Sequence, residues 1–192
     1  WLAAADFLRA RFPRSVLIDI GSTTTDIIPL GNFPALLGLT DLDRLQRGYL
    51  LYTGLLRTSV ATQLPAVTLE GVVTPTSAEQ FAIAADAHLV LGHIPPRAYS
   101  CDPPDRGEKN VGAALRRLAR VICADLEEIG PQGAMEIARQ FWEAQRDRIR
   151  TAADRVAREC GIPVTINDRD PLAVEVIRRN AAHAGVDAEI TQ

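Results

Sequence analysis

Residues 15–30, SVLIDIGSTTTDIIPL, form the stretch that decides the fold. Residues 15–20 are a short apolar run rich in branched side chains, which predicts a buried strand. Residues 21–24 predict a tight turn, and residues 25–30 predict a second strand. The expected unit is therefore a strand, a turn of small hydroxyl residues and a second strand.

The predicted turn has the chemistry of a phosphate-binding loop. Gly21 permits a positive φ and allows a close approach of backbone to a ligand, and successive N–H groups in such a turn form a concave anion site. Ser22, Thr23 and Thr24 add hydroxyl donors without bulk. We therefore expect Gly21, Ser22, Thr23 and Thr24 to bind phosphate. The alternative is a plain tight hairpin whose threonines are solvated.

Two carboxylates flank this turn, and they are the predicted catalytic residues. Asp19 stands at the end of the first strand. Because an ionised carboxylate has no proton, it cannot donate a hydrogen bond to phosphate. Its expected role is to hold a hydrated Mg²⁺, through water, or to position a water molecule. Asp26 either braces the turn or joins the metal shell.

Outward from this unit, the chain alternates predicted strands and helices, which is typical of an α/β protein. The Thr40 and Ser77 positions predict helix starts, the second through a capping box with Gln80. Expected helices cover residues 2–10, 40–47, 77–88, 111–126, 133–160 and 170–184. Residues 49–54, 60–63 and 67–73 are expected to be strands or extended segments, and further strands are expected over residues 162–166 and 187–190.

Composition excludes several classes of protein. The 192 residues are 47% hydrophobic and 23% charged, which fits one globular domain or two small ones rather than a disordered chain. The net charge of −3 gives no reason to expect nucleic acid as the main partner. No run approaches the length of a membrane span. The three cysteines, Cys101, Cys123 and Cys160, are expected to be free thiols in a reducing cytoplasm.

The chain begins with Trp1, and its only methionine is Met135, so we expect a fragment of a longer protein. His88 and His93 lack zinc spacing and are interpreted as structural.

Residues 19–30, DIGSTTTDIIPL, resemble the phosphate-binding hairpin of the superfamily of acetate and sugar kinases, heat-shock chaperones and actin. Within it, they are most similar to the second hairpin of the hydantoinase/oxoprolinase family, Asp-x-Gly-x-Thr-x-x-Asp. Later blocks resemble a smaller branch of that family, which includes a methanofuran-type coenzyme biosynthesis enzyme and proteins encoded beside tetrahydromethanopterin-linked one-carbon genes. These blocks are Tyr52-Thr53-Gly54 with Arg57-Thr58, residues 81–92, Asp102-x-x-Asp105-Arg106-Gly107 and residues 116–125.

The resemblance implies a ribonuclease-H-like, actin-type ATPase lobe with a phosphate hairpin and a helical C-terminal half, as a fragment of a two-lobe fold. Residues 1–130 would form this lobe, and residues 131–192 would form a helical segment with a short strand. The partners implied are a phosphorylated small molecule and a missing N-terminal lobe, with a homo-oligomer left open. The fragment alone is expected to be inactive.

The resemblance also implies the reaction, a Mg²⁺-assisted transfer that releases diphosphate. A synthase of this branch joins a furan-methyl diphosphate to a tyramine-type phenol. The alternatives are ATP-dependent opening of a cyclic amide and a non-catalytic nucleotide-binding module. Residues 160–170 contain no Gly-x-Gly, which argues against ATP binding. Candidate substrate or anion contacts, with solvated surface positions as the alternative, are Thr53, Gly54, Arg57, Asp102, Asp105 and Arg106.

Overall fold

The computed structural model describes residues 1–162, which divide into two compact units. Of the described residues, unit 1 contains residues 1–52 and 147–162, and unit 2 contains residues 53–146. Both units combine helices with a small antiparallel sheet, so the protein is a mixed α/β structure. The expected boundary between residues 130 and 131 remains a prediction, as do the elements expected within residues 163–192, which lie outside the described residues.

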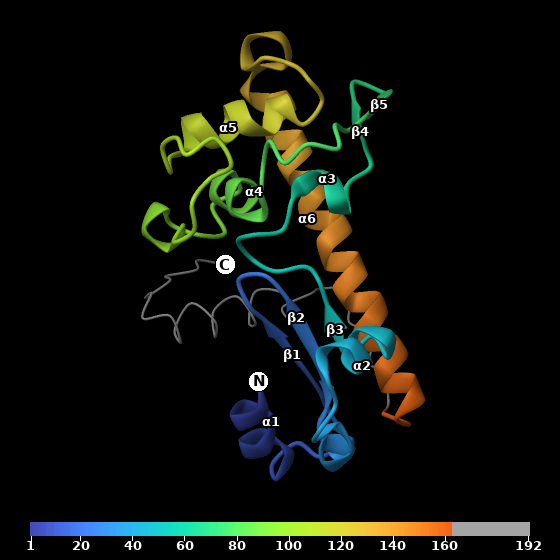
Figure 1. Ribbon diagram of the computed structural model, residues 1–192. Helices are drawn as coiled ribbons and strands as arrows, with labels where there is room; N and C mark the ends of the chain where they lie inside the picture. The colour runs from blue at the N-terminus through green and yellow to red at the C-terminus, as the bar shows by residue number, and fades with distance from the viewer. Residues whose placement is uncertain (163–192) are drawn as a thin grey trace. The chain divides into compact units, whose positions relative to one another are not determined.

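Unit 1 is built on a three-stranded antiparallel sheet in the order β1-β2-β3 (Figure 1). The predicted strand–turn–strand unit is confirmed: β1 (Val16–Ile20) pairs with β2 (Thr25–Pro29) from Val16 opposite Pro29 to Ile20 opposite Thr25. The remaining elements are α1 (Leu2–Arg9), the 3-10 segment η1 (Leu30–Leu36), α2 (Asp41–Gln46), β3 (Leu50–Leu51) and the end of α6 (Leu126–Glu159).

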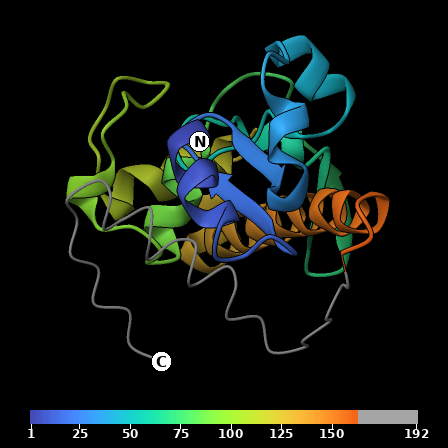
Figure 2. The same cartoon turned by 90° about the horizontal axis from the view of Figure 1, so that it is seen from below.

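The two faces of this sheet bury different clusters, because successive side chains of a strand point to opposite faces. Leu17 and Ile28 are cross-strand partners and pack with α1 and η1. Ile18 and Ile27 are the next pair, and they pack with the end of α6, which runs along one side of the sheet in both views (Figures 1 and 2). Burial on both faces explains why these strands are nearly continuous apolar runs.

Unit 2 packs helices around two apolar clusters. It contains α3 (Val60–Gln63), the hairpin β4 (Ala66–Leu69) and β5 (Val72–Pro75), α4 (Ala84–Val90), the 3-10 segment η2 (Pro96–Ala98), α5 (Val111–Arg120) and the start of α6. Val60, Leu118 and Phe141 lie at the centre of one cluster, and Leu56, Leu89 and Tyr99 lie in the other. Small alanines of α4 and α5 let these helices approach closely.

Several expected elements of unit 2 are wrong, each for a local reason. Residues 60–63 form a helix rather than a strand, since four residues carry too little periodicity to separate the two. Residues 67–73 are not one strand, because Glu70 and Gly71 both have positive φ and form a two-residue hairpin turn. In unit 1, the strand expected over residues 49–54 shortens to Leu50–Leu51.

The helix expected from Ser77 does not form. The Ser77 hydroxyl accepts from the Glu79 N–H at 3.1 Å, and the Ser77 N–H donates to the Val121 carbonyl at 2.7 Å. The helix begins only at Ala84.

The apolar stripe predicted as one helix over residues 111–126 is two elements. Helix α5 ends at Arg120, and Cys123 has a φ of 59°, a left-handed conformation that breaks the helix. Helix α6 then starts at Leu126 and kinks at Gly130, whose φ is 65°. Ile122 and Leu126 still pack on the same cluster as Leu118, so the stripe marks a shared core rather than a continuous helix.

Within residues 1–162, no helix combines the length and the apolar character that crossing a membrane requires. All three cysteines are free, as expected: Cys101 is buried, Cys160 is partly buried and Cys123 is exposed.

Candidate functional site

The turn of the β1–β2 hairpin presents unused backbone donors. The Gly21 N–H donates to the Thr24 carbonyl at 2.8 Å and closes the turn. Among residues 1–162, no acceptor contacts the N–H groups of Ser22, Thr23 and Thr24. Ser22 is exposed and the two threonines are half-buried, so these donors stand at the surface. Three adjacent unpaired N–H groups with three hydroxyls are the donor set that a phosphate group needs.

Gly21 does not have a positive φ, so the turn does not need its left-handed freedom. The turn needs a residue without a side chain, because the Thr24 carbonyl lies close to this position. A Cβ at this position would lie 3.2 Å from the Thr24 carbonyl oxygen, tighter than ordinary contact. The glycine therefore allows the hydrogen bond that closes the turn.

Asp19 and Asp26 are cross-strand partners, so their side chains share one face of the hairpin. The structure gives them different surroundings. Asp26 is 13% exposed and contacts the Arg44 guanidinium, which also bonds Asp41 at 2.9 Å and lies over the Trp1 ring. Asp19 is 33% exposed, and its Oδ2 lies 3.8 Å from the backbone nitrogen of Trp1. The geometry thus suits Asp26 for bracing the hairpin and leaves Asp19 more accessible.

Arg44 is placed for this contact by a well-capped short helix. The Thr40 hydroxyl accepts from the Asp43 N–H at 3.1 Å, and the Asp43 carboxylate accepts from the Thr40 N–H at 2.9 Å. This reciprocal capping box confirms the helix start predicted at Thr40.

Unit 2 contains a separate cavity of about 320 Å³. Its lining includes two of the predicted contact residues, Arg57 and Asp102, together with Gln80, Ile83, Cys101 and Pro104. Burial raises the pKa of the Cys101 thiol, so this sulfur is neutral and not a thiolate nucleophile at neutral pH. Asp102 is exposed, and its Oδ1 lies 3.6 Å from the Lys109 amine.

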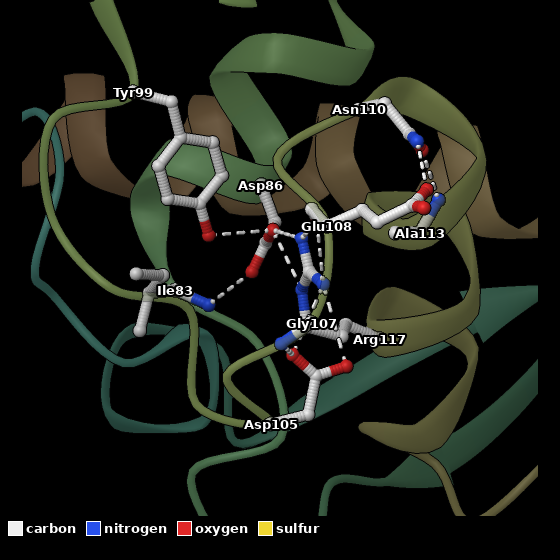
Figure 3. Close-up of polar contacts among 9 residues, drawn as sticks. All are labelled: Ile83, Asp86, Tyr99, Asp105, Gly107, Glu108, Asn110, Ala113 and Arg117. Atoms are coloured by element: carbon white, nitrogen blue, oxygen red, sulfur yellow. Dashed lines mark hydrogen bonds and ion pairs between the residues drawn. The ribbon is translucent and has the colours of Figure 1, made fainter.

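The loop that carries Cys101, Asp102 and Pro104 forms one wall of this cavity. A buried ion pair contacts this loop (Figure 3). The Arg117 guanidinium donates to Asp86 Oδ1 from Nε at 2.9 Å and from Nη2 at 2.7 Å. The side chains are 3% and 0% exposed. Burial raises the pKa of Asp86, and the adjacent Arg117 opposes that shift. Because both charges are buried, each is the other's essential partner.

The Asp86–Arg117 pair also forms hydrogen bonds with three residues of the loop, Tyr99, Asp105 and Glu108. The Tyr99 hydroxyl donates to Asp86 Oδ1 at 2.9 Å, and Arg117 Nη1 donates to the Glu108 carbonyl and to Asp105 at 3.2 Å each. Asp86 Oδ2 also accepts from the Ile83 N–H at 3.0 Å, at the start of α4. Asp105, a predicted substrate contact, is therefore engaged in holding the loop. Arg106 is exposed in a left-handed conformation with a φ of 54°.

Thr53 and Gly54, also predicted contacts, lie inside unit 2 in a second polar network. The Gln145 amide donates to Thr53 Oγ1 at 2.9 Å and to the Gly54 carbonyl at 3.0 Å. Its oxygen lies 3.0 Å from His88 Nε2, and His88 Nδ1 lies 3.1 Å from His93 Nδ1. An amide oxygen only accepts, so His88 carries its proton on Nε2 and His93 donates from Nδ1.

Both histidines of this network are neutral. Burial, and then the adjacent His93, lower the pKa of His88 to about 3. Burial also lowers the pKa of His93. Within residues 1–162, no group of three or more His, Cys, Asp or Glu residues could hold a metal ion.

Sequence reasoning did not assign Asp86, Arg117 or Gln145 to any site. One signal was present: Asp86 interrupts the apolar stretch FAIAADAHLV of residues 81–90, where a carboxylate needs a buried partner. Nothing in the sequence identifies Arg117 as that partner.

Comparison with known proteins identifies the family. The model of the family described as hydantoinase/oxoprolinase matches residues 2–167. The chain belongs to this family. The chain is also 39% identical over 159 residues to the (4-{4-[2-(gamma-L-glutamylamino)ethyl]phenoxymethyl}furan-2-yl)methanamine synthase of Methanocaldococcus jannaschii, covering 82% of this chain and 48% of the relative. The Methanococcus vannielii protein of the same name is 35% identical over 159 residues, covering 82% of this chain and 72% of the relative.

These similarities confirm the resemblance to the coenzyme-biosynthesis branch of the hydantoinase/oxoprolinase family. The chain spans about half the length of the first relative. A much shorter match links 37 residues, 19% of this chain, to 10% of the tRNA (guanine(26)-N(2))-dimethyltransferase of Methanosphaerula palustris at 60% identity.

Proposed function

We propose that this chain supplies one lobe of a synthase that forms an aryl ether in the assembly of a methanofuran-type coenzyme. The similarity over 82% of the chain to two synthases carries this proposal. Their shared name describes a product in which a phenoxymethyl group links a furan to a glutamylated tyramine unit. A second lobe, with its own hairpin, would complete the active site.

The β1–β2 hairpin is the proposed phosphate site of a ribonuclease-H-like lobe. The three unpaired N–H groups of residues 22–24 support this role. Their donors are already positioned by the Gly21–Thr24 hydrogen bond and the strand register, so little reorganisation accompanies binding. Positioned donors stabilise negative charge where it develops in a reaction.

The reaction is a substitution at the methylene carbon of a furan-methyl diphosphate. The bond between that carbon and the diphosphate oxygen breaks, and diphosphate leaves with the electron pair. The phenol oxygen forms the new ether bond to the same carbon, and its proton is released to solvent. Ser22, Thr23 and Thr24 would bind the leaving diphosphate and stabilise the charge that it gains.

Asp19 fits a Mg²⁺ held largely by water and by substrate phosphates. Such ions commonly use one or two protein carboxylates, and Asp19 is a partly exposed carboxylate beside the phosphate turn. Mg²⁺ bound there would neutralise charge on the leaving diphosphate. Asp26 would hold the hairpin through Arg44, since its carboxylate already contacts that guanidinium.

The test uses the protein from the full open reading frame that contains these residues. The protein is incubated with Mg²⁺, the furan-methyl diphosphate and a tyramine acceptor, and diphosphate and ether are quantified. We expect acceptor-dependent diphosphate and an ether product, with no ATP consumed. Release of ADP and phosphate from ATP without ether would overturn the proposal in favour of ATP-dependent opening of a cyclic amide.

Substitutions in the hairpin test its proposed role as the phosphate site. Asp19→Ala should abolish diphosphate release without changing the circular dichroism spectrum. Asp6→Asn is the matched control, because Asp6 is an exposed carboxylate on α1 that pairs with Arg9 at 2.7 Å. Unchanged diphosphate affinity in Asp19→Ala and in Thr23→Ala would exclude the hairpin as the phosphate site.

A further inference from the structure

The Arg57 side chain lies at the cavity of unit 2. The side chain is exposed and lines the cavity. Among residues 1–162, no carboxylate, carbonyl or hydroxyl pairs with it by a hydrogen bond or an ion pair. An arginine that stabilises the fold has partners, as Arg117 and Arg44 do. The N–H donors of the Arg57 guanidinium are therefore available to an external anion.

The loop that carries Arg57 is held firmly by buried bonds. The Thr58 hydroxyl accepts from the Gly54 N–H at 2.7 Å, and Gln145 holds the Gly54 carbonyl at 3.0 Å. The Leu56 and Thr58 carbonyls accept from the N–H groups of Ala85 and Ala84 at 3.0 and 2.7 Å. Arg57 thus projects from a loop whose backbone is bonded on both sides of it, which lowers the cost of ordering a ligand contact.

The rest of the cavity lining favours an anion of moderate size. Gln80, Ile83 and Pro104 carry no charge, and the raised pKa keeps the Cys101 thiol neutral. Asp102 is the one carboxylate that residues 1–162 contribute to the lining, and Lys109 offsets its charge at 3.6 Å. A volume of about 320 Å³ is enough for the end of a substrate and small for a complete nucleotide.

We propose that Arg57 binds the carboxylate at the glutamyl end of the phenolic acceptor and so selects acceptors that carry this group. The inference rests on the proposed function and adds the acceptor subsite to it. A guanidinium matches a carboxylate with two parallel N–H donors. The diphosphate of the other substrate has its own donors at the hairpin turn, so the cavity arginine is free for the acceptor.

The test compares two acceptors, γ-glutamyltyramine and tyramine, which differ by the carboxylate-bearing group. The measured quantity is the ratio of their kcat/KM values in the full-length protein. Arg57→Ala should lower this ratio about 10- to 100-fold, because a charge-assisted hydrogen-bonded pair is lost. Arg57→Lys should retain part of the preference, since it keeps the charge but not the fork. Arg116 is an exposed arginine of α5 that is not among the lining residues, and Arg116→Ala should leave the ratio unchanged.

Gln145 gives a second readout, as a positioning residue for the same loop. Gln145→Leu removes both bonds to residues 53 and 54 and should raise the KM for γ-glutamyltyramine more than it lowers kcat. The KM of the diphosphate substrate should stay unchanged.

Two results would overturn the inference. One is an unchanged acceptor ratio in Arg57→Ala, and the other is a rise in the KM of the diphosphate substrate instead, which would assign Arg57 to phosphate. If the wild-type protein forms no ether, the proposed function fails separately. Binding of γ-glutamyltyramine to the chain, followed by NMR, then decides the inference: Arg57→Ala must weaken it at least 10-fold, or the subsite is excluded.

Discussion

The β1–β2 turn and the Asp86–Arg117 pair use polar groups in opposite ways. The turn comes from consecutive residues, and its N–H groups and hydroxyls have few internal partners. The ion pair joins residues 31 positions apart, and both side chains are almost wholly buried. Polar groups of the turn are available to a ligand, whereas those of the pair already form hydrogen bonds inside the protein. Substitutions should therefore reduce binding in the first region and stability in the second.

The largest expected effect is on the buried pair. Arg117→Met leaves Asp86 buried without its counter-charge and should lower the free energy of unfolding by about 3–5 kcal/mol. Urea unfolding of the full chain measures this loss. Arg120 lies on the same helix as Arg117, and Arg120→Met, which removes an exposed ion pair to Asp125, should cost less than about 1 kcal/mol. Equal losses in the two variants would contradict the comparison.

Acidification should produce the next largest effect, through the buried histidines. The pKa of His88 is about 3 in the folded chain and about 6.5 in an unfolded one. Between these values only the unfolded chain binds the proton, so stability is complete above pH 6.5 and falls as the pH drops. The slope approaches about 1.4 kcal/mol per pH unit for one such histidine. Urea unfolding from pH 7 to pH 5 tests this, and an equally steep fall in His88→Gln would refute the assignment.

A smaller effect is expected at the helix cap that supports the hairpin. Thr40→Ala removes one half of the capping box of α2 and should cost about 1 kcal/mol of stability. Thr40→Ser keeps the hydroxyl and should restore most of it. Thermal unfolding measures both, and an alanine variant as stable as the serine variant would show that the cap contributes nothing.

The smallest stability effect should lie in the turn itself. Ser22→Ala removes an exposed hydroxyl and should change the free energy of unfolding by less than about 0.5 kcal/mol. The same variant should weaken diphosphate binding measured by calorimetry. A variant that loses stability but binds diphosphate normally would reverse the roles given to the two regions.

Local sequence patterns predicted unit 1 better than unit 2. The hairpin and the Thr40 cap depend on neighbouring residues, and both are confirmed. The turn at Glu70 and Gly71 escaped prediction because short apolar segments flank it on both sides and together suggested one strand. Ser77 does not start a helix, and its N–H donates to the distant Val121 carbonyl. Of the candidate site residues, Arg57 and Asp102 line the cavity. Thr53 and Gly54 form hydrogen bonds with Gln145, and Asp105 forms one with Arg117.

By itself, the sequence determined the family, the strand–turn–strand unit and the residues of its turn, because these depend on contiguous residue types and short-range hydrogen bonds. Only the tertiary structure decided that Arg117 neutralises Asp86, that Gln145 links His88 to the loop at Gly54, and that Arg57 lines a cavity without a partner among residues 1–162. The physical reason is that a buried polar group must find a partner wherever the packing of helices places one, and that choice is made by long-range geometry rather than by spacing along the chain.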